Sequence, residues 1–153
     1  MNFILSVTSA ANDAIFMARS AVFYASKKNE IDALKNDARL LAIELKCECG
    51  RNKFDSSLDR AKSPVQKAVE VVLNPQSKGG DIDKCGRDIS KIFLTLTSDS
   101  GKKAEIKSLL ERGIAVVKQF NHSVVEGHTR SSENINRIVN GEINSGFEQV
   151  KKW

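Results

Sequence analysis

The chain has 153 residues, of which 41% are hydrophobic and 28% charged, with a formal net charge of +5. This composition excludes a disordered chain, and the length predicts one domain with its own core. The basic excess is typical either of ordinary solubility or of a protein with an anionic partner, a nucleic acid or an acidic lipid surface.

The first segment, residues 2–26, contains only two charged residues, Asp13 and Arg19. Small and apolar residues recur in alternating steps of three and four, which places them on one helical face: Ile4, Val7, Ala11, Ala14, Ala18, Ala21 and Ala25. A second set covers much of the remaining circumference: Phe3, Ile15, Phe16, Val22 and Phe23. We therefore expect a helix that is either buried in a core or placed against a membrane. If the helix is core, Ala18→Glu is expected to unfold the protein. If the helix is a releasable membrane element, the variant is expected to stay folded and to lose lipid binding.

The charged stretch Lys27-Lys28-Asn29-Glu30 comes next, and the apolar pattern changes phase across it. The following heptad seam consists of Ile31, Leu34, Ala38, Leu41 and Leu45. The phase change means either a turn between two antiparallel helices or a stammer in one long helix, and the polar cluster favours the turn. Gly50 is expected to end this helix in the left-handed conformation.

Two further helices are predicted before residue 98. The first seam is Phe54, Leu58, Ala61, Val65, Ala68 and Val72, and Pro64 within it either splits or kinks the helix. Asn74-Pro75 ends it. Asp81 is the expected cap of the next helix, whose seam is Ile82, Cys85, Ile89, Ile92 and Leu96.

The last part of the chain predicts two more helices. One begins near Lys102, with Ile106, Leu109, Gly113, Val117, Phe120 and Val124 on its seam, and Gly113 there is expected to permit a close helix contact. After 127–129, Ser131 or Ser132 is the expected cap of a final helix that contains Ile135, Ile138, Val139, Ile143, Phe147 and Val150. Glycines and asparagines at 140–141 and 144–146 weaken it, so we expect it to be frayed, mobile or dependent on a partner. The predicted fold is an all-α antiparallel bundle of five to six helices, with residues 1–128 as the bundle and 129–153 as a C-terminal helix.

The sequence contains no recognisable catalytic arrangement. His122 and His128 lie six residues apart and so face different sides of a helix. Cys47-Glu48-Cys49 lacks the spacing of a zinc site, and Gly79-Gly80 lacks the pattern of a phosphate loop. We therefore expect no enzyme activity, no cofactor, no metal and no small-molecule substrate. No uninterrupted apolar run reaches the length of a membrane span, and the expected location is the cytoplasm, with or without association at a membrane.

Basic residues form the main candidate surface. Lys84, Arg87 and Lys91 share one helical face, and Lys102, Lys103 and Lys107 begin the next helix. Aromatic residues are only 6% of the chain, which weakens nucleic acid as a partner relative to lipid or protein. Lys151-Lys152-Trp153 is either an interfacial anchor, a capping contact or a disordered end. The candidate membrane or partner surface is Phe3, Ile4, Phe16, Phe23, Lys27, Lys28, Lys84, Arg87, Lys91, Lys102, Lys103 and Trp153.

Three segments carry a resemblance to a known family: Ile82-Asp83-Lys84-Cys85, Ile92-Phe93-Leu94-Thr95 and the helix from Lys102 to Phe120. In this order they resemble the third and fourth helices of the executioner bundle in mixed-lineage kinase domain-like proteins. HeLo-type fungal domains and the coiled-coil domains of plant immune receptors share this plan. The resemblance covers residues 2–125, and the chain departs from it at Pro64 and in its Gly-rich last helix. It implies a cytosolic cell-death or defence module that oligomerises and docks or inserts its first helix on an acidic membrane.

Taken together, the sequence predicts a non-enzymatic interaction domain that forms homo-oligomers or binds a protein partner, and that associates with or permeabilises acidic membranes. The alternatives are a self-assembling viral or filament coat subunit and a plain protein–protein adaptor bundle.

Overall fold

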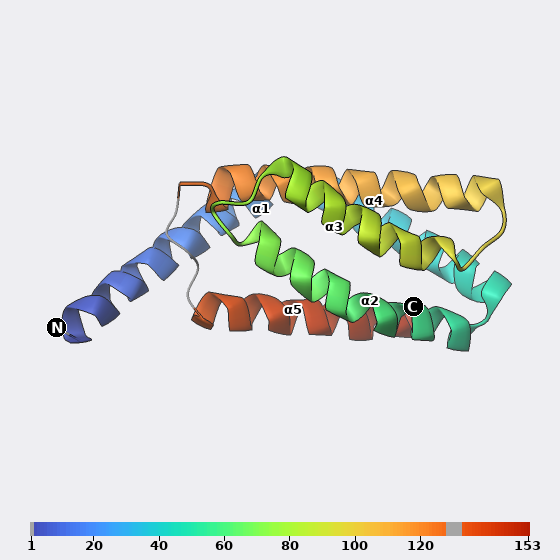
Figure 1. Cartoon of the computed structure of the whole chain (residues 1–153), viewed down its shortest axis with the longest axis horizontal. Coiled ribbons are helices and arrows are strands. Elements are labelled where there is room, and N and C mark those ends of the chain that lie inside the picture. The colour runs from blue at the N-terminus through green and yellow to red at the C-terminus, as the bar shows by residue number, and fades with distance from the viewer. Residues whose placement is uncertain (1, 128–132) are drawn as a thin grey trace.

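The structure is a computed structural model that describes the backbone of residues 2–127 and 133–153 and the side chains of residues 10–127 and 133–153. Over these residues the chain is all-α, as predicted. The helices are α1 (Asn2–Cys49), α2 (Arg51–Val72), α3 (Gly79–Leu94), α4 (Ser100–Phe120) and α5 (Glu133–Lys152), and a π-helical segment, η1 (Asn121–Val125), continues α4. Successive helices run in alternating directions, with α4 packed on α1 and α5 packed on α2 (Figure 1). His128, Ser131 and Ser132 lie outside the described residues.

The predicted turn at residues 27–30 is wrong, because α1 is one continuous helix of 48 residues. The apparent phase change results from following the alanine stripe. A different stripe faces the bundle without interruption, and all of its residues are buried or half-buried: Phe16, Ser20, Phe23, Lys27, Ile31, Leu34, Ala38, Leu41, Leu45 and Cys49. Its steps of three and four keep it on one face throughout, so the helix has no reason to break at the charged stretch. Lys27 stays on this stripe with its ammonium 3.7 Å from the Glu30 carboxylate.

A single residue, Gly50, joins α1 to α2. Its φ of 89° lies in the left-handed region, which a residue with a side chain rarely adopts, so the expected role of this glycine is confirmed. The Gly50 amide donates to the Lys46 carbonyl at 3.0 Å, and the Gly50 carbonyl accepts from the Phe54 amide at 3.1 Å. The reversal is therefore tight and places α2 against the end of α1. Pro64 lies inside α2, which continues through it rather than splitting into two helices.

The starts of α3 and α4 differ in detail from the prediction. Asp81 lies in the first turn of α3 rather than at its cap, and its carboxylate accepts from the Lys78 amide at 2.9 Å. At α4 the cap is Asp99, which accepts from the Gly101 amide at 2.9 Å. Both carboxylates thus satisfy amides that a helix N-terminus leaves without partners.

Two apolar clusters form the core. One joins the end of α1 to α2 and α5, and its buried members include Leu45, Phe54, Ala61 and Phe147. The other joins the middle of α1 to α4 and η1, and it includes Phe16, Phe23, Val116, Val124 and Ile135. Both clusters receive residues from α5, which is helical through the glycines and asparagines at 140–146. Helix α5 is therefore part of the bundle rather than an appendage beside it.

Lys46 fixes the end of α5 to the end of α1. It is only 9% exposed, and its ammonium donates to the carbonyl oxygens of Val150 at 2.7 Å and Trp153 at 2.9 Å. A cation is favourable at the carbonyl end of a helix, where four acceptors lack helical partners. Burial lowers the pKa of the Lys46 ammonium, and the nearby Arg51 guanidinium lowers it further. Arg51 also donates to the Lys151 carbonyl at 2.9 Å, so two cations hold this helix end.

We expect Lys46→Met to lower the free energy of unfolding by about 1.5–3 kcal/mol, because the variant leaves the carbonyl oxygens of α5 without their charged donor. Urea denaturation measures the change. Lys53→Met is the control, since Lys53 is an exposed lysine of the adjacent helix, and its expected effect is within about 0.5 kcal/mol. Equal effects of the two substitutions would show that Lys46 does not hold α5.

Candidate interaction surfaces

The outward face of α1 is the first candidate surface. Of the two placements left open by the sequence, the core does not hold for the alanine stripe, because Ala11, Ala14, Ala18, Ala21 and Ala25 are all exposed. Ile15 and Val22 lie beside them and are 47% and 71% exposed. Asp13 and Arg19 lie off this face, so the face has no charged residue over about four helical turns. We call these seven residues the alanine face.

The same helix extends beyond its neighbours. At 1.5 Å per residue α1 is about 72 Å long, whereas the 21 residues of α4 span about 32 Å. Its N-terminal end projects past the other helices, at the left of the bundle (Figure 1). The alanine face lies on the side of α1 opposite Phe16 and Phe23, which pack into the bundle, and no other described helix covers it.

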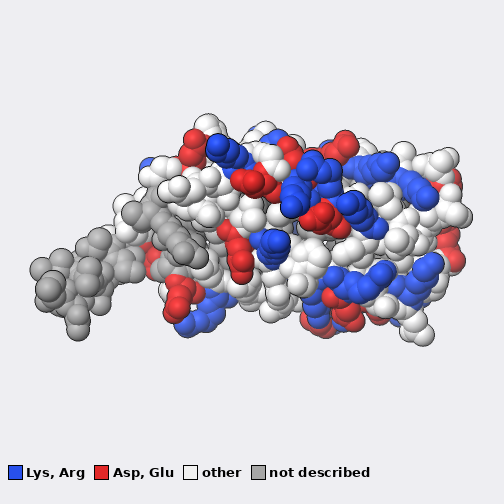
Figure 2. All heavy atoms as spheres, viewed as in Figure 1, with Lys and Arg blue, Asp and Glu red and all other residues white. Residues whose placement is uncertain are grey.

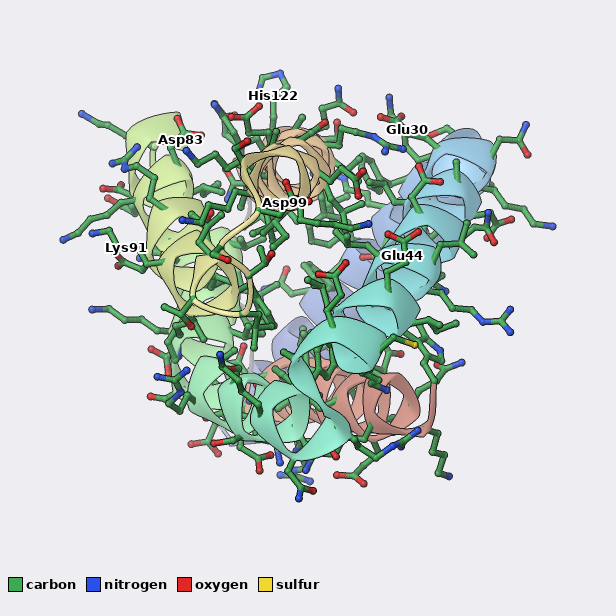
Figure 3. All side chains as sticks on the ribbon, turned by 90° about the vertical axis from the view of Figure 1, so that its right-hand side faces the viewer. Glu30, Glu44, Asp83, Lys91, Asp99 and His122 are labelled. Atoms are coloured by element: carbon green, nitrogen blue, oxygen red, sulfur yellow. The ribbon has the colours of Figure 1, made fainter. Side chains whose placement is uncertain are left out.

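Basic side chains on α3 and α4 form the second candidate surface. Lys84, Arg87, Lys91, Lys103 and Lys107 are exposed, and no described carboxylate lies within ion-pair distance of them. Figure 2 shows Lys and Arg side chains over the part of this face that α3 and α4 form, with fewer acidic side chains among them. In the end-on view Lys91 points away from the bundle (Figure 3). Lys102 differs from these residues, because it pairs with Glu44 of α1 and with Glu105.

A groove runs between α3 and α4 under these basic residues. It encloses about 630 Å³, and its floor is Gly86, Leu94, Leu110, Ile114 and Ala115. Arg87 and Lys91 stand on the α3 rim, and Lys107 and Glu111 stand on the α4 rim. At one end Asp83 and Lys118 close the groove with an ion pair of 3.2 Å.

Gly86 determines how closely α3 and α4 approach. A Cβ atom there would lie 2.6 Å from Cγ1 of Ile114, closer than two carbon atoms can pack. At Gly113, the glycine expected to permit a close contact, a Cβ atom would meet no neighbouring atom within 4 Å. The close approach is therefore at Gly86 and not at Gly113.

The other residues of the predicted surface lie elsewhere. Phe16 and Phe23 are each 7% exposed and belong to the core, so their assignment to a contact surface is corrected. They are buried because both rings pack edge-on against Phe120, at centroid distances of 6.2 and 5.4 Å. Trp153 is half-buried against the first core cluster, and Lys28 is exposed on α1. The side chains of Phe3 and Ile4 lie outside the described residues.

Cys85 and the potential metal ligands complete the description of the candidate chemistry. Burial raises the pKa of the Cys85 thiol, which disfavours the reactive thiolate, and the charge of Asp88 acts in the same direction. The part of the chain that the structure describes holds no group of three or more potential metal ligands. Among the same residues, no helix combines the length and the hydropathy needed to cross a membrane.

The groove is the feature that sequence reasoning missed. Lys84, Arg87 and Lys91 are visible as a basic stripe, but nothing in the sequence pairs them with Lys107, Glu111 and Ile114 of α4. The sequence does show basic and apolar residues at regular i, i+3/i+4 spacing on both helices, which is the signal for the two rims. It does not show how α3 and α4 lie relative to each other, and the groove depends on that.

Comparison of the chain with protein-family models, with curated proteins and with solved structures found no match.

Proposed function

We propose that this protein is a non-enzymatic, self-assembling helical module that pairs the alanine face of α1 with the same face of a second copy. The observation that carries this proposal is an uncharged helical face in which Val22 is 71% exposed and Ile15 47% exposed. Contiguous exposed apolar surface is typical of a site of contact with a protein or a membrane.

The spacing of the alanines supports a helical partner. Positions 11, 14, 18, 21 and 25 alternate in steps of three and four, which is the repeat of a helix-pairing seam. Alanine at such positions lets two helix axes approach to about 8 Å, the close end of the usual range. Alanine contributes little to the free energy of binding to a lipid surface, because burial of each methyl group is worth only about 0.8 kcal/mol. The larger Phe16 and Phe23, which suit membrane insertion better, point into the bundle.

The face is also complementary to itself. Ala11 and Ala21 lie at equal distances from the level of Phe16, and so do Ala14 and Ala18. A two-fold axis at this level would therefore place alanine opposite alanine in successive layers of an antiparallel pair. Homodimers with such an axis use the same patch on both subunits. Because α1 is one continuous helix without a turn at residues 27–30, self-assembly through this face needs no release of α1 from the bundle.

Sedimentation velocity over a range of concentrations tests this proposal on the full chain. The wild type is expected to show a concentration-dependent dimer. Ala18→Glu is expected to weaken the dimer at least about a hundredfold, because the interface would bury carboxylates without partners. It should leave the circular dichroism spectrum unchanged, and its thermal midpoint should equal that of the wild type at concentrations where both are monomeric, since Ala18 is exposed.

The matched control is Ala104→Glu, the same substitution at an exposed alanine of α4, which should dimerise like the wild type. A wild-type monomer at all concentrations would contradict the proposal, as would a dimer that Ala18→Glu leaves intact. A monomer that floats with phosphatidylserine vesicles, and loses flotation in Ala18→Glu, would assign the alanine face to lipid instead.

A further inference from the structure

We propose that the groove between α3 and α4 is a docking site for an acidic amphipathic helix of a partner protein. This surface is separate from the alanine face, so the inference does not depend on self-assembly. It rests on the coincidence of an apolar floor with cationic rims in one cavity of about 630 Å³.

The floor determines the kind of contact. Leu94, Leu110 and Ile114 line it, and the Ile114 side chain packs against Gly86, so the floor is apolar where the two helices meet. An apolar floor between two helices is filled by side chains that project from a ligand, whereas a flat membrane surface would span the rims. Nucleic acid would find no aromatic ring among the residues of the groove on which to stack a base.

The rims determine the charge of the ligand. Arg87, Lys91 and Lys107 flank the floor, and no described carboxylate lies within ion-pair distance of them. Lys118 is already neutralised by Asp83, and Glu111 is the one acidic residue of the central rim. Three cations against one carboxylate favour a ligand that presents acidic residues beside its apolar ones.

The length of the groove matches a short helix. From Gly86 to Leu94 the α3 rim advances by about 12 Å at 1.5 Å per residue. An amphipathic helix with apolar anchors at i, i+3 or i+4, and i+7 spans about 10 Å over the same number of turns. The occupant is therefore a helix of about two to four turns, with its apolar stripe on the floor and its carboxylates toward the two rims.

The probe is a synthetic, fluorescein-labelled helical peptide of leucine, alanine and glutamate, with leucine at i, i+3, i+7 and i+10 and glutamate at the flanking positions. A second peptide has the same composition with its leucines distributed around the helix. Fluorescence anisotropy is titrated with the full-length protein at low and at physiological salt. The first peptide is expected to bind, with an affinity that falls as salt rises, and the second to bind at least about tenfold more weakly.

Two variants locate the binding. Arg87→Glu/Lys107→Glu reverses one cation on each rim and is expected to weaken binding at least about tenfold. Lys28→Glu/Lys35→Glu makes the same change in net charge with two exposed lysines of α1, and it should weaken binding less than about threefold. Ser90 also lines the groove. Ser90→Trp therefore fills it without a change in charge and is expected to abolish binding, while its circular dichroism spectrum reports that the bundle is intact.

Absence of binding by the first peptide would overturn the inference. Equal binding of the two peptides would also overturn it, as would equal losses in the groove and α1 charge variants. Flotation of the wild type with phosphatidylserine vesicles, lost in Arg87→Glu/Lys107→Glu and accompanied by no peptide binding, would assign the basic surface to lipid and reject the helical partner. Because Ala18→Glu leaves the groove unchanged, failure of the dimer and failure of peptide docking are distinguishable.

Discussion

Replacing Phe23 by alanine is expected to lower the free energy of unfolding by about 3–5 kcal/mol. The ring is 7% exposed and lies edge-on to Phe120, with 5.4 Å between the ring centroids. The buried ring stabilises the fold directly and forms part of the contact between α1 and η1. The variant leaves a cavity, because the backbone of a continuous helix cannot shift to fill it. Urea unfolding followed by circular dichroism measures the change.

Tyr24→Ala is the matched control for this substitution. Tyr24 is the next residue of the same helix, but it is 56% exposed, so its loss should change the free energy of unfolding by no more than about 1 kcal/mol. A larger effect at Tyr24 than at Phe23 would mean that α1 presents a different face to the bundle. The pair therefore tests the orientation of α1, on which both the second core cluster and the exposure of the alanine face depend.

Replacing Pro64 by alanine is expected to raise the free energy of unfolding by about 1–3 kcal/mol. Proline in the interior of a helix costs about 3 kcal/mol relative to alanine, because it provides no amide for the carbonyl four residues earlier and its ring crowds that carbonyl. In α2 that carbonyl belongs to Arg60, and part of the gain is offset by loss of the half-buried proline ring. Chemical denaturation measures the difference.

Ser63→Ala is the control for Pro64→Ala, because Ser63 is an exposed neighbour in the same helix. Its expected effect is a gain of at most about 0.5 kcal/mol from helix propensity alone. If Pro64→Ala instead lowers the stability, the proline shapes α2 for its packing on α3 and α5, and the local cost of the ring is outweighed by those contacts.

Much of the fold could be predicted from local chemistry. The heptad seams of α2 and α4 identified Phe54, Leu58, Ala61 and Ile106 as core, and all four are buried. Gly50 was identified as a left-handed helix end because glycine adopts positive φ at little cost. Seams and helix ends depend on residues within one or two helical turns of each other, so they can be predicted from the sequence of a single chain.

The orientation of α1 could not be obtained in this way. Its N-terminal half has apolar residues on both faces, and periodicity alone does not distinguish the alanine stripe from the stripe that contains Phe16 and Phe23. The alanine stripe has the more regular spacing, and following it produced the false turn at residues 27–30. Contact with Phe120 and Val124 determines which stripe of α1 faces the bundle, because burial of large rings stabilises the fold more than burial of methyl groups does.

For the two candidate surfaces, too, some features follow from the sequence and others only from the tertiary structure. By itself, the sequence determined an all-α chain, the positions of most helix ends, the alanine repeat and the basic stripe on α3, because each depends on neighbours along the chain. Only the tertiary structure decided that the alanine repeat faces solvent and that the basic stripe borders a groove. Both outcomes depend on which helices touch and at what register, and the register of α3 on α4 is set where Gly86 meets Ile114, 28 residues apart in the chain.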